Sequence, residues 1–402
     1  MNVTILLESR FDRTPDGAVW TRTTFSYTAW SRYLDVFDEV RVVARVRDVA
    51  EAPSDGKRVD GDRVSCVAVP YYIGPWQYIL HYQSIKRVVK KAVEQADAVV
   101  LRISSPIARI ASPLMRKNGN PYAVEVAADP YDVFSPGSVD HPLRPVFRRL
   151  FTWQTQRQCR EACAASYVTS HALQRRYPCP QYSVGISDVV LLDEAFVQNK
   201  KRVFESSRTT ELIFVGTLEQ LYKAPDILIE AVGMCVRKGL DIKLAFVGDG
   251  RQMPALQDKV AVLGLNDRIE FLGNLQAGEA VRAQLDQADL FVLPSRQEGL
   301  PRALVEAMAR GLPCIGSTVG GIPELLPPED SVPSGDAGAL ADKIREMITD
   351  QKRMVDASNR NLDKASEYRE ELLQKKRIEF YRYVEEATRQ AKSIHEVSLA
   401  GS

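Results

Sequence analysis

The sequence FVLPSRQEGLPRALVEAMARGLPCIGSTVGGIPEL, at residues 291–325, decides the fold class. It predicts in turn a buried strand, a loop, a helix and a second strand, at residues 290–293, 294–300, 302–309 and 314–316. Pro301 stands where the start of a helix tolerates proline, so the N–H groups of Arg302 and Ala303 would be unpaired and suited to a phosphate oxygen. Because ligands of parallel α/β sheets bind beyond the carboxyl ends of the strands, we expect an anion site at this loop.

The same alternation of strands and helices extends along the whole chain. Strand candidates lie at residues 3–7, 40–46, 64–69, 98–103, 122–126, 167–169, 211–215, 243–247 and 269–272, with a helix at 225–237. The first strand leads into a polar loop with Gly17, and we expect a helix after it. The pattern predicts an α/β protein with two Rossmann-like, doubly wound domains.

A polar stretch, NKKRVFESSRTT after Gln198, has the composition of a linker. We therefore expect an N-terminal domain at residues 1–195 and a C-terminal domain at 196–372. The charged tail at 373–402 has the apolar spacing of an amphipathic helix, which we expect to close back on the N-terminal domain.

Composition excludes several classes of function. The chain has 402 residues and a formal net charge of +1, which predicts no nucleic-acid partner. Its six cysteines form no CxxC pair, so they predict neither a zinc site nor a disulfide framework and fit a reducing cytoplasm. The first residues lack the pattern of a leader, and no apolar run approaches the roughly 20 residues of a membrane span, so we expect neither. We expect a cytoplasmic protein that is neither exported nor integral to a membrane.

Two glutamates in the 291–325 stretch are spaced as E-x7-E. Glu298 lies in the loop and Glu306 lies about one and a half turns into the helix, so their carboxylates should sit at different depths of one cleft. Carboxylates accept pairs of hydroxyl hydrogen bonds, and a sugar nucleotide offers one diol on the ribose and one on the hexose. Surface glutamates also occur at this spacing by chance, and the surrounding sequence decides between the two interpretations.

With that surrounding sequence the chain resembles the family 4 retaining glycosyltransferases, which have the GT-B fold of two Rossmann-like domains facing across a cleft. The resemblance implies that Glu298 contacts the donor sugar and that Glu306 contacts the ribose. It places the donor along Gly299, Leu300, Pro301 and Arg302, although the family has a glycine where this chain has Pro301.

A second motif of the family is a strand followed by Gly-Arg and, six residues later, lysine, whose two cations grip the diphosphate. Here it reads FVGTLEQLYKAPDILIEA, so Gly216 and Lys223 match and Thr217 replaces the arginine. One of two cations that stabilise the leaving group is therefore missing. Another basic residue would have to substitute, and the candidates are Arg22, Arg251 and Arg296.

The third motif lies in KLAFVGDGRQMPALQDKVAVLGLNDRIEFLGNL. The resemblance implies that Gly273, Asn274 and Leu275 face the nucleotide base. Gly248 and Gly250 follow a strand as in a dinucleotide fingerprint, but the third glycine and a ribose acid are absent, so we expect no NAD and no other cofactor.

The N-terminal half matches less closely. The family has a glycine-bearing loop after its first strand, where Gly17 stands, and many members have a histidine after a mid-domain strand. That strand reads YAVEVAADPYDVF here and holds Glu125 and Asp129 instead. Either carboxylate could stabilise positive charge at the anomeric carbon or could cap a turn. We expect the acceptor to enter around Gly17 and residues 125–137, with Asp129, Glu298 and Lys223 as the catalytic candidates.

Two further stretches carry charged residues. Asp60-Gly61-Asp62 could hold a divalent metal, but the flanking VDGDRV reads as a hairpin turn, and the histidines lack metal-ligand spacing, so we expect no metal. The stretch HPLRPVFRRLFTWQTQRQCR, at residues 141–160, mixes five arginines with aromatic residues. It could contact an anionic membrane or a lipid-linked acceptor, or it could be a helix with a solvated basic face.

The predicted reaction is transfer of a sugar from a nucleoside diphosphate sugar, with a UDP-sugar favoured, to an acceptor hydroxyl. The resemblance implies retention of the anomeric configuration, no metal, a glycan or lipid-linked acceptor, and a place in polysaccharide or glycolipid assembly. Two alternatives remain open: a GT-B enzyme of another kind, such as a sugar-nucleotide epimerase or a phosphorylase, and a non-catalytic protein that binds a sugar or a nucleotide.

Overall fold

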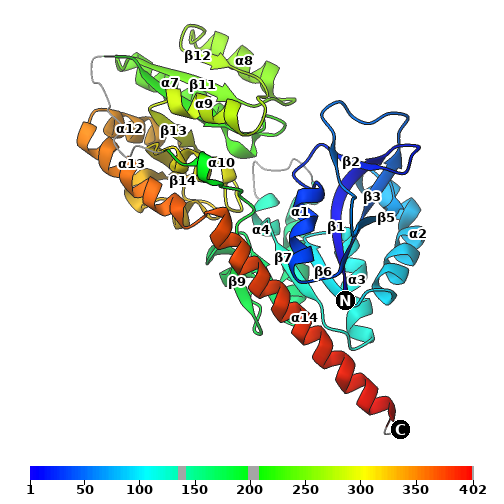
Figure 1. The fold of residues 1–402 in the computed structure, drawn as a ribbon. Coiled ribbons are helices and arrows are strands. Elements are labelled where there is room, and N and C mark those ends of the chain that lie inside the picture. Colours follow the sequence, from blue (N-terminus) through cyan, green and yellow to red (C-terminus); the bar gives the residue numbers. More distant parts are fainter. Residues whose placement is uncertain (135–141, 198–207, 401–402) are drawn as a thin grey trace.

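The computed structural model describes residues 1–134, 142–197 and 208–400, with side chains up to residue 394. Its strands form two separate sheets, one from residues 2–185 and one from residues 210–332. Figure 1 shows the two α/β bodies side by side, with the C-terminal helix running from one along the other. We refer to the two bodies as the N-terminal and C-terminal domains.

The N-terminal sheet is built around β1, which pairs in parallel with β3 and β6. The order across its parallel part is β5-β3-β1-β6-β7-β8-β9; the short strand β2 pairs antiparallel with the end of β1, and β4 pairs antiparallel with β2. The strands are β1 (Asn2–Arg13), β2 (Val19–Thr21), β3 (Glu39–Asp48), β4 (Lys57–Arg58), β5 (Val64–Pro70), β6 (Ala98–Ile103), β7 (Ala123–Val126), β8 (Ala164–Tyr167) and β9 (Ser183–Gly185). β6 reads AVVLRI and is buried almost throughout, as expected for a central strand covered on both faces.

Helices cover both faces of this sheet. One face packs against α2 (Gly74–Glu94), α3 (Pro106–Lys117) and α5 (Arg144–Glu161), which contribute Ile85, Ile107 and Cys159 to one core. The other face packs against α1 (Tyr27–Ser31), η1 (Arg32–Asp35) and α14 (Glu370–Ala400), with Trp30 and Phe380 in a second core. The short helices α4 (Pro130–Val133), α6 (Ala172–Arg176) and η2 (Asp193–Ala195) lie in the connections.

The C-terminal sheet is entirely parallel, in the order β12-β11-β10-β13-β14-β15. Its strands are β10 (Thr210–Val215), β11 (Ile242–Val247), β12 (Ile269–Phe271), β13 (Leu290–Leu293), β14 (Cys314–Ser317) and β15 (Ser331–Val332). In chain order this is the 3-2-1-4-5-6 arrangement of a Rossmann domain, whose direction of winding reverses between β10 and β13. A ligand site is expected at that reversal, beyond the carboxyl ends of these two strands.

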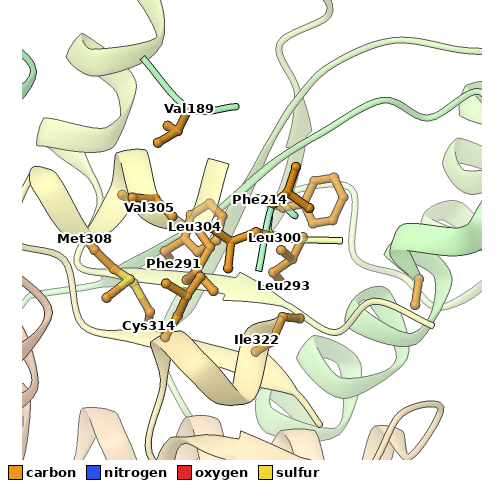
Figure 2. Close-up of a cluster of buried hydrophobic side chains, with 14 of the residues drawn as sticks. Val189, Phe214, Phe291, Leu293, Leu300, Leu304, Val305, Met308, Cys314 and Ile322 are labelled. Atoms are coloured by element: carbon orange, nitrogen blue, oxygen red, sulfur yellow. The ribbon is translucent and has the colours of Figure 1, made fainter. Parts of the chain in front are cut away.

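Nine helical segments of the described residues accompany this sheet before α14. They are η3 (Leu221–Lys223), α7 (Pro225–Arg237), α8 (Met253–Val262), α9 (Glu279–Gln287), α10 (Arg302–Ala309), α11 (Ile322–Leu325), η4 (Pro328–Asp330), α12 (Ala337–Ile348) and α13 (Gln351–Ser366). Figure 2 shows how α10 is anchored, with Leu300, Leu304 and Met308 among the buried side chains around Phe291 of β13. Val189, from the segment that follows the N-terminal sheet, packs into the same cluster. Burial of Leu300, Leu304 and Met308 therefore fixes the position of the loop that precedes α10.

The predicted strands and helices are present, with differences at two places. The chain does not form strand, loop and helix at its start: β1 continues to Arg13 and turns at Gly17 into the antiparallel β2. The extension forms because Phe11 is buried and β3 pairs with β1 beyond a register shift between Leu6 and Arg10. The strand predicted at 167–169 lies at Ala164–Tyr167.

Three other predictions of the sequence can be compared with the structure. The Asp60-Gly61-Asp62 turn is confirmed, because Gly61 and Val64 exchange backbone hydrogen bonds. The predicted linker at 199–210 falls largely on residues 198–207, outside the described residues. Within the described residues, no helix is both long enough and apolar enough to cross a membrane.

Candidate active site

A cavity of about 1220 Å³ is lined by residues of both domains. On the C-terminal side it lies at the ends of β10 and β13, where the strand order reverses. Of the predicted donor-binding residues, all but Gly273 line it: Gly216, Thr217, Lys223, Asn274, Leu275, Glu298, Gly299, Leu300, Pro301, Arg302 and Glu306. The structure thus brings together residues that are up to 90 positions apart in the sequence.

Lys223 and Glu298 form an ion pair in this wall. Lys223 Nζ donates to Glu298 Oε1 at 2.8 Å, and the hydroxyl of Ser295 donates to the same oxygen at 2.8 Å. The side chains of Lys223 and Glu298 are only 13% and 8% exposed. Ala224, between η3 and α7, has a left-handed φ of 54°, which is uncommon for a residue with a Cβ and turns the chain directly after Lys223. The diphosphate cation and the sugar-binding carboxylate that the family resemblance implies are therefore in contact with each other.

Gly216 provides the space for this lysine. A Cβ added at Gly216 would lie 2.5 Å from Lys223 Cδ, closer than non-bonded carbons approach. The side chain of Lys223 thus crosses directly over the backbone at the end of β10, which explains why glycine is needed at the start of the second motif.

Glu306 lies on α10 beside two arginines. Burial raises the pKa of the Glu306 carboxyl, while the charges of Arg302 and then Arg282 act in the opposite direction. Both arginines line the cavity, and within the described part of the chain neither side chain has a hydrogen bond or ion pair. Arg302 is also the first residue of α10, where the helix dipole favours an anion. Arg282, on α9, was not predicted, because its position four residues after Gly278 matches none of the motifs.

The three arginines proposed to replace the motif's missing cation are not at the cavity. Arg296 makes a two-pronged ion pair with Asp226 at 2.7 and 2.8 Å. Arg251 pairs with Glu219 at 2.5 Å, and Arg22 pairs with Asp55 at 2.9 Å. None of the three lines the cavity, so that expectation is corrected: each arginine is already held by a carboxylate elsewhere.

Glu125 stands in the N-terminal wall of the cavity within a buried hydrogen-bond network. Tyr33 donates to Glu125 Oε1 at 2.5 Å, and Arg102 donates to Oε2 at 2.8 Å. Burial, and then the negative charge of Glu125, raise the pKa of the Tyr33 hydroxyl, which therefore stays protonated. Arg102 also pairs with Asp188, and the positions of all four groups are consequently fixed by one another.

The other two N-terminal candidates lie away from the cavity. Asp129 caps α4, accepting from the N–H of Tyr131 at 2.9 Å and from the hydroxyl of Tyr177 at 2.5 Å, and it pairs with Arg176. Asp129 therefore has the capping role that the sequence left open beside a catalytic one, and it does not line the cavity. Gly17 is exposed in the turn between β1 and β2, with φ 85°, and does not line the cavity either. The predicted acceptor region also extends to residues 135–137, which are outside the described residues.

The C-terminal helix contributes residues that the sequence motifs did not reveal. Arg377, Phe380 and Tyr381 of α14 line the cavity, and Tyr381 stacks on Tyr33 with ring centroids 4.2 Å apart. Glu370 accepts from Arg377 at 2.9 Å and pairs with Arg32 of η1 at 3.1 Å. Only the return of α14 to the N-terminal domain brings these groups to the cavity.

The two domains meet at the bottom of the cavity. A Cβ added at Gly299 would lie 2.5 Å from the carbonyl oxygen of Ala127, so the loop before α10 lies directly against the end of β7. Nearby, the carboxylate of Glu324 accepts from the backbone N–H groups of Ser170, His171 and Ala172 at 2.6, 2.9 and 2.6 Å. A carboxylate of one domain thus caps the start of α6 in the other.

Comparison with known proteins identifies the class of enzyme. Residues 209–350, which contain Lys223, Glu298 and Glu306, match the family model described as glycosyl transferases group 1. The chain is 32% identical over 170 residues to the N-acetyl-alpha-D-glucosaminyl L-malate synthase of Bacillus anthracis, covering 42% of this chain and 43% of that relative. The protein is a glycosyltransferase. A longer match, 27% identical over 299 residues and 74% of both chains, is to Protein CapJ of Staphylococcus aureus.

Solved structures show that the glycosyltransferase has the GT-B fold. Sucrose-phosphate synthase from Thermosynechococcus elongatus superimposes with a TM-score of 0.70 and 16% identity, over 96% of this chain and all of that chain. HepE from Anabaena, in complex with UDP and glucose, gives a TM-score of 0.63 at 16% identity, over 94% of this chain and 98% of that chain. The two domains facing across a cavity are therefore arranged as in other glycosyltransferases of this fold.

Proposed function

We propose that this enzyme is a family 4 retaining hexosyltransferase, which transfers a sugar from a nucleoside diphosphate sugar to an acceptor hydroxyl without a metal ion. The observation that carries the proposal is the pair of Lys223 and Glu298, 2.8 Å apart in a cavity that Glu306 also lines. Two carboxylates and a lysine at one strand-order reversal match the two diols and the diphosphate of such a donor.

In this proposal Glu306 binds the ribose diol, Glu298 binds hydroxyls of the donor sugar, and Asn274 and Leu275 face the base. The diphosphate occupies the start of α10, where Lys223, Arg302 and Arg282 surround it. Arg302 and Arg282 then supply the positive charge that Thr217 does not. Binding would draw Lys223 away from Glu298 and leave that carboxylate available to the sugar.

The chemical step needs no nucleophile from the protein. The bond from the anomeric carbon to the diphosphate oxygen breaks while the acceptor oxygen bonds to the same face of that carbon, so the configuration is retained. The departing diphosphate oxygen takes the acceptor's proton, which balances the reaction as nucleoside diphosphate plus glycoside. Cations fixed before the reaction stabilise the charge that develops on the leaving group.

The donor is proposed to be a UDP-sugar. HepE, which shares the fold, was solved with UDP and glucose, and this supports uridine without specifying the sugar for this chain. The acceptor, a glycan or a lipid-linked sugar, would lie against the wall that contains Glu125, Arg102 and Tyr33. The B. anthracis relative is named as a synthase of N-acetyl-alpha-D-glucosaminyl L-malate.

The setting proposed for the reaction is the assembly of a polysaccharide or a glycolipid. No disulfide bond joins any of the six cysteines, all of which lie in the described residues, and this supports a reducing compartment such as the cytoplasm.

The experiment is donor turnover in the presence of EDTA. UDP-, GDP- and ADP-sugars are incubated with the enzyme, with water or methanol as a surrogate acceptor, and the first-formed product is observed by proton NMR before its anomers equilibrate. We expect release of one nucleotide and a product with the donor's anomeric configuration. Lys223→Met and Glu298→Gln should each lower the rate by about 10²-fold or more, whereas Arg251→Gln, at a paired arginine outside the cavity, should not.

Other products would contradict the proposal. The opposite anomer would show inversion, an epimer of the donor sugar would show a different GT-B reaction, and nucleotide release only after addition of a divalent ion would show a metal requirement.

A further inference from the structure

Large apolar side chains are exposed on two helices of the N-terminal domain. On α2, Trp76 is 79% exposed and Leu80 is 80% exposed. On α5, Val146, Leu150 and Trp153 are 58%, 39% and 55% exposed. Side chains of this size that gather on one surface of a soluble domain usually mark an interaction site.

The spacing places each set on a single helix face. Trp76 and Leu80 are four residues apart, while Val146, Leu150 and Trp153 follow one another at four and three residues, so each set forms a stripe along its helix. The opposite faces are buried in the domain core, through Ile85 of α2 and Cys159 of α5. Both helices therefore have a second apolar face, which the core does not need.

Both stripes lie on the layer of helices that covers one face of the N-terminal sheet. The helices α2, α3 and α5 pack on the same face of the N-terminal sheet, with α3 contributing to the same core. Arg109 of α3 lies 5.1 Å from the ring centroid of Phe151 on α5 and donates to Gln154 of α5 at 3.3 Å. It also interacts with Tyr78 of α2, so α3 bridges the other two helices. We call the exposed side of α2 and α5 the α2–α5 surface.

Positive charge accompanies these apolar residues. α2 carries four lysines and arginines against one glutamate, and α5 carries five arginines against one glutamate, although the whole chain has a net charge of only +1. Some of this charge is engaged: Lys90 pairs with Glu94, Arg157 pairs with Glu161, and Arg148 stacks on Tyr131. Arg149 and Arg160 are exposed.

We infer that the α2–α5 surface docks the enzyme onto a bilayer of anionic lipid, with Trp76 and Leu80 entering the interface and the arginines contacting headgroups. Tryptophan beside aliphatic residues and an excess of arginine is the composition of interfacial helices, and charge complementarity selects an anionic surface. The inference is independent of the proposed reaction, since none of these residues lines the cavity.

Docking in this way would place the membrane near the acceptor side of the cavity. α2 starts just after β5 ends, at the edge of the sheet where the strands end. α5 ends just before β8 begins, at the opposite edge, so its start lies at the same edge as the start of α2. Glu125, in the acceptor-side wall, is at the end of β7 on the same edge. An acceptor held in the bilayer would therefore be presented at the open end of this domain.

The test is co-sedimentation of the full chain with vesicles of phosphatidylcholine, with and without phosphatidylglycerol. We expect binding to the anionic vesicles that weakens as salt is added. The Trp76→Gln/Leu80→Gln variant should lower the partition coefficient by about tenfold or more. The Arg149→Gln/Arg160→Gln variant should lower it by roughly 25-fold, at about fivefold for each charge near the surface. Val262→Gln, which removes an 86% exposed apolar side chain from the other domain, should have no effect.

Three results would overturn the inference. These are no sedimentation with anionic vesicles, equal binding of all the variants, and a concentration-dependent dimer in ultracentrifugation that the Trp76→Gln/Leu80→Gln variant abolishes. Calorimetric binding of UDP to the same variants tests the donor site separately from membrane docking. Variants that bind UDP like the wild type have an intact donor site, whether or not they bind the vesicles.

Discussion

Substitution of Lys223 by methionine tests the paired arrangement in the cavity wall. Methionine keeps the length of the side chain and removes its charge, so the carboxylate of Glu298, 8% exposed, loses its cation. Removing one partner of a buried ion pair costs about 3–5 kcal/mol. Because the hydroxyl of Ser295 still donates at 2.8 Å, we expect a smaller loss of unfolding free energy. A retained hydrogen bond to a charged group is worth about 1.5 kcal/mol or more, which leaves a loss of roughly 2–3 kcal/mol.

The assay is a double-mutant cycle of Lys223→Met and Glu298→Gln, followed by urea or thermal unfolding of the nucleotide-free enzyme. Lys223→Met alone should lower the melting temperature of the C-terminal domain by roughly 5–10 °C. The double variant should recover a large part of this loss, since no charge is then left unpaired. With saturating UDP the coupling between the two positions should shrink, because the diphosphate takes the place of Glu298 as the partner of Lys223.

Unfolding of Lys223→Met at the same midpoint as the wild type, or equal coupling with and without UDP, would show that Lys223 and Glu298 do not form the expected ion pair. Arg251→Gln serves as the control, because Arg251 forms an exposed ion pair with Glu219. Exposed ion pairs contribute about 0–1 kcal/mol, so this substitution should change the free energy of unfolding by less than about 1 kcal/mol.

Three further substitutions extend the test. Burial raises the pKa of Glu306 in the folded state, so at intermediate pH the folded state holds a proton that the unfolded state has lost. The free energy of unfolding without ligand should therefore fall as pH rises from the ordinary glutamate pKa through the folded-state pKa. Glu306→Gln should remove this pH dependence in unfolding measured across pH 4 to 8, and it should weaken UDP binding. Glu324→Gln keeps the shape but loses the charge that accepts three backbone N–H groups of the other domain, and calorimetric unfolding should show a loss of about 1–2 kcal/mol. Gly216→Ala should displace Lys223, whose Cδ would lie 2.5 Å from the added Cβ, and should weaken UDP binding about tenfold or more in titration calorimetry. The control Gly338→Ala, at the start of α12, should leave UDP affinity unchanged. Equal affinities of the two variants would show that Lys223 does not contact the nucleotide.

Seven elements of the C-terminal domain could be predicted from the sequence to within a residue of their observed bounds: β10, α7, β11, β12, β13, α10 and β14. Its central strand β13 is a continuous run of buried apolar residues, LFVL at 290–293, and its loops carry Gly, Pro and Asn at the ends of the strands. Glu298 and Glu306 could be placed in one cleft because a strand, a loop and a helix fix their relative positions within a single short segment. Local geometry was sufficient in this part of the chain.

Other parts of the site depend on contacts between distant segments. Arg377 and Tyr381 reach the cavity because α14 packs on the N-terminal sheet, and Arg282 reaches it because α9 packs against β10; no local pattern indicates either position. The β1–β2 extension, which leaves Gly17 exposed in a turn, depends on pairing with β3. Asp129 illustrates the same limit, because only the structure shows that Arg176 and Tyr177, nearly 50 residues away, hold its carboxylate.

The central claim is that the wall formed by Lys223, Glu298 and Glu306 binds a nucleoside diphosphate without metal. The most direct measurement is titration calorimetry of UDP, GDP and ADP into the enzyme in EDTA, repeated with Lys223→Met, Glu306→Gln and the control Arg251→Gln. We expect one nucleotide, UDP, to bind with 1:1 stoichiometry, and the first two substitutions each to weaken its binding about tenfold or more while the control does not. Absence of binding for all three nucleotides, or affinity unchanged by both cavity substitutions, would contradict the central claim.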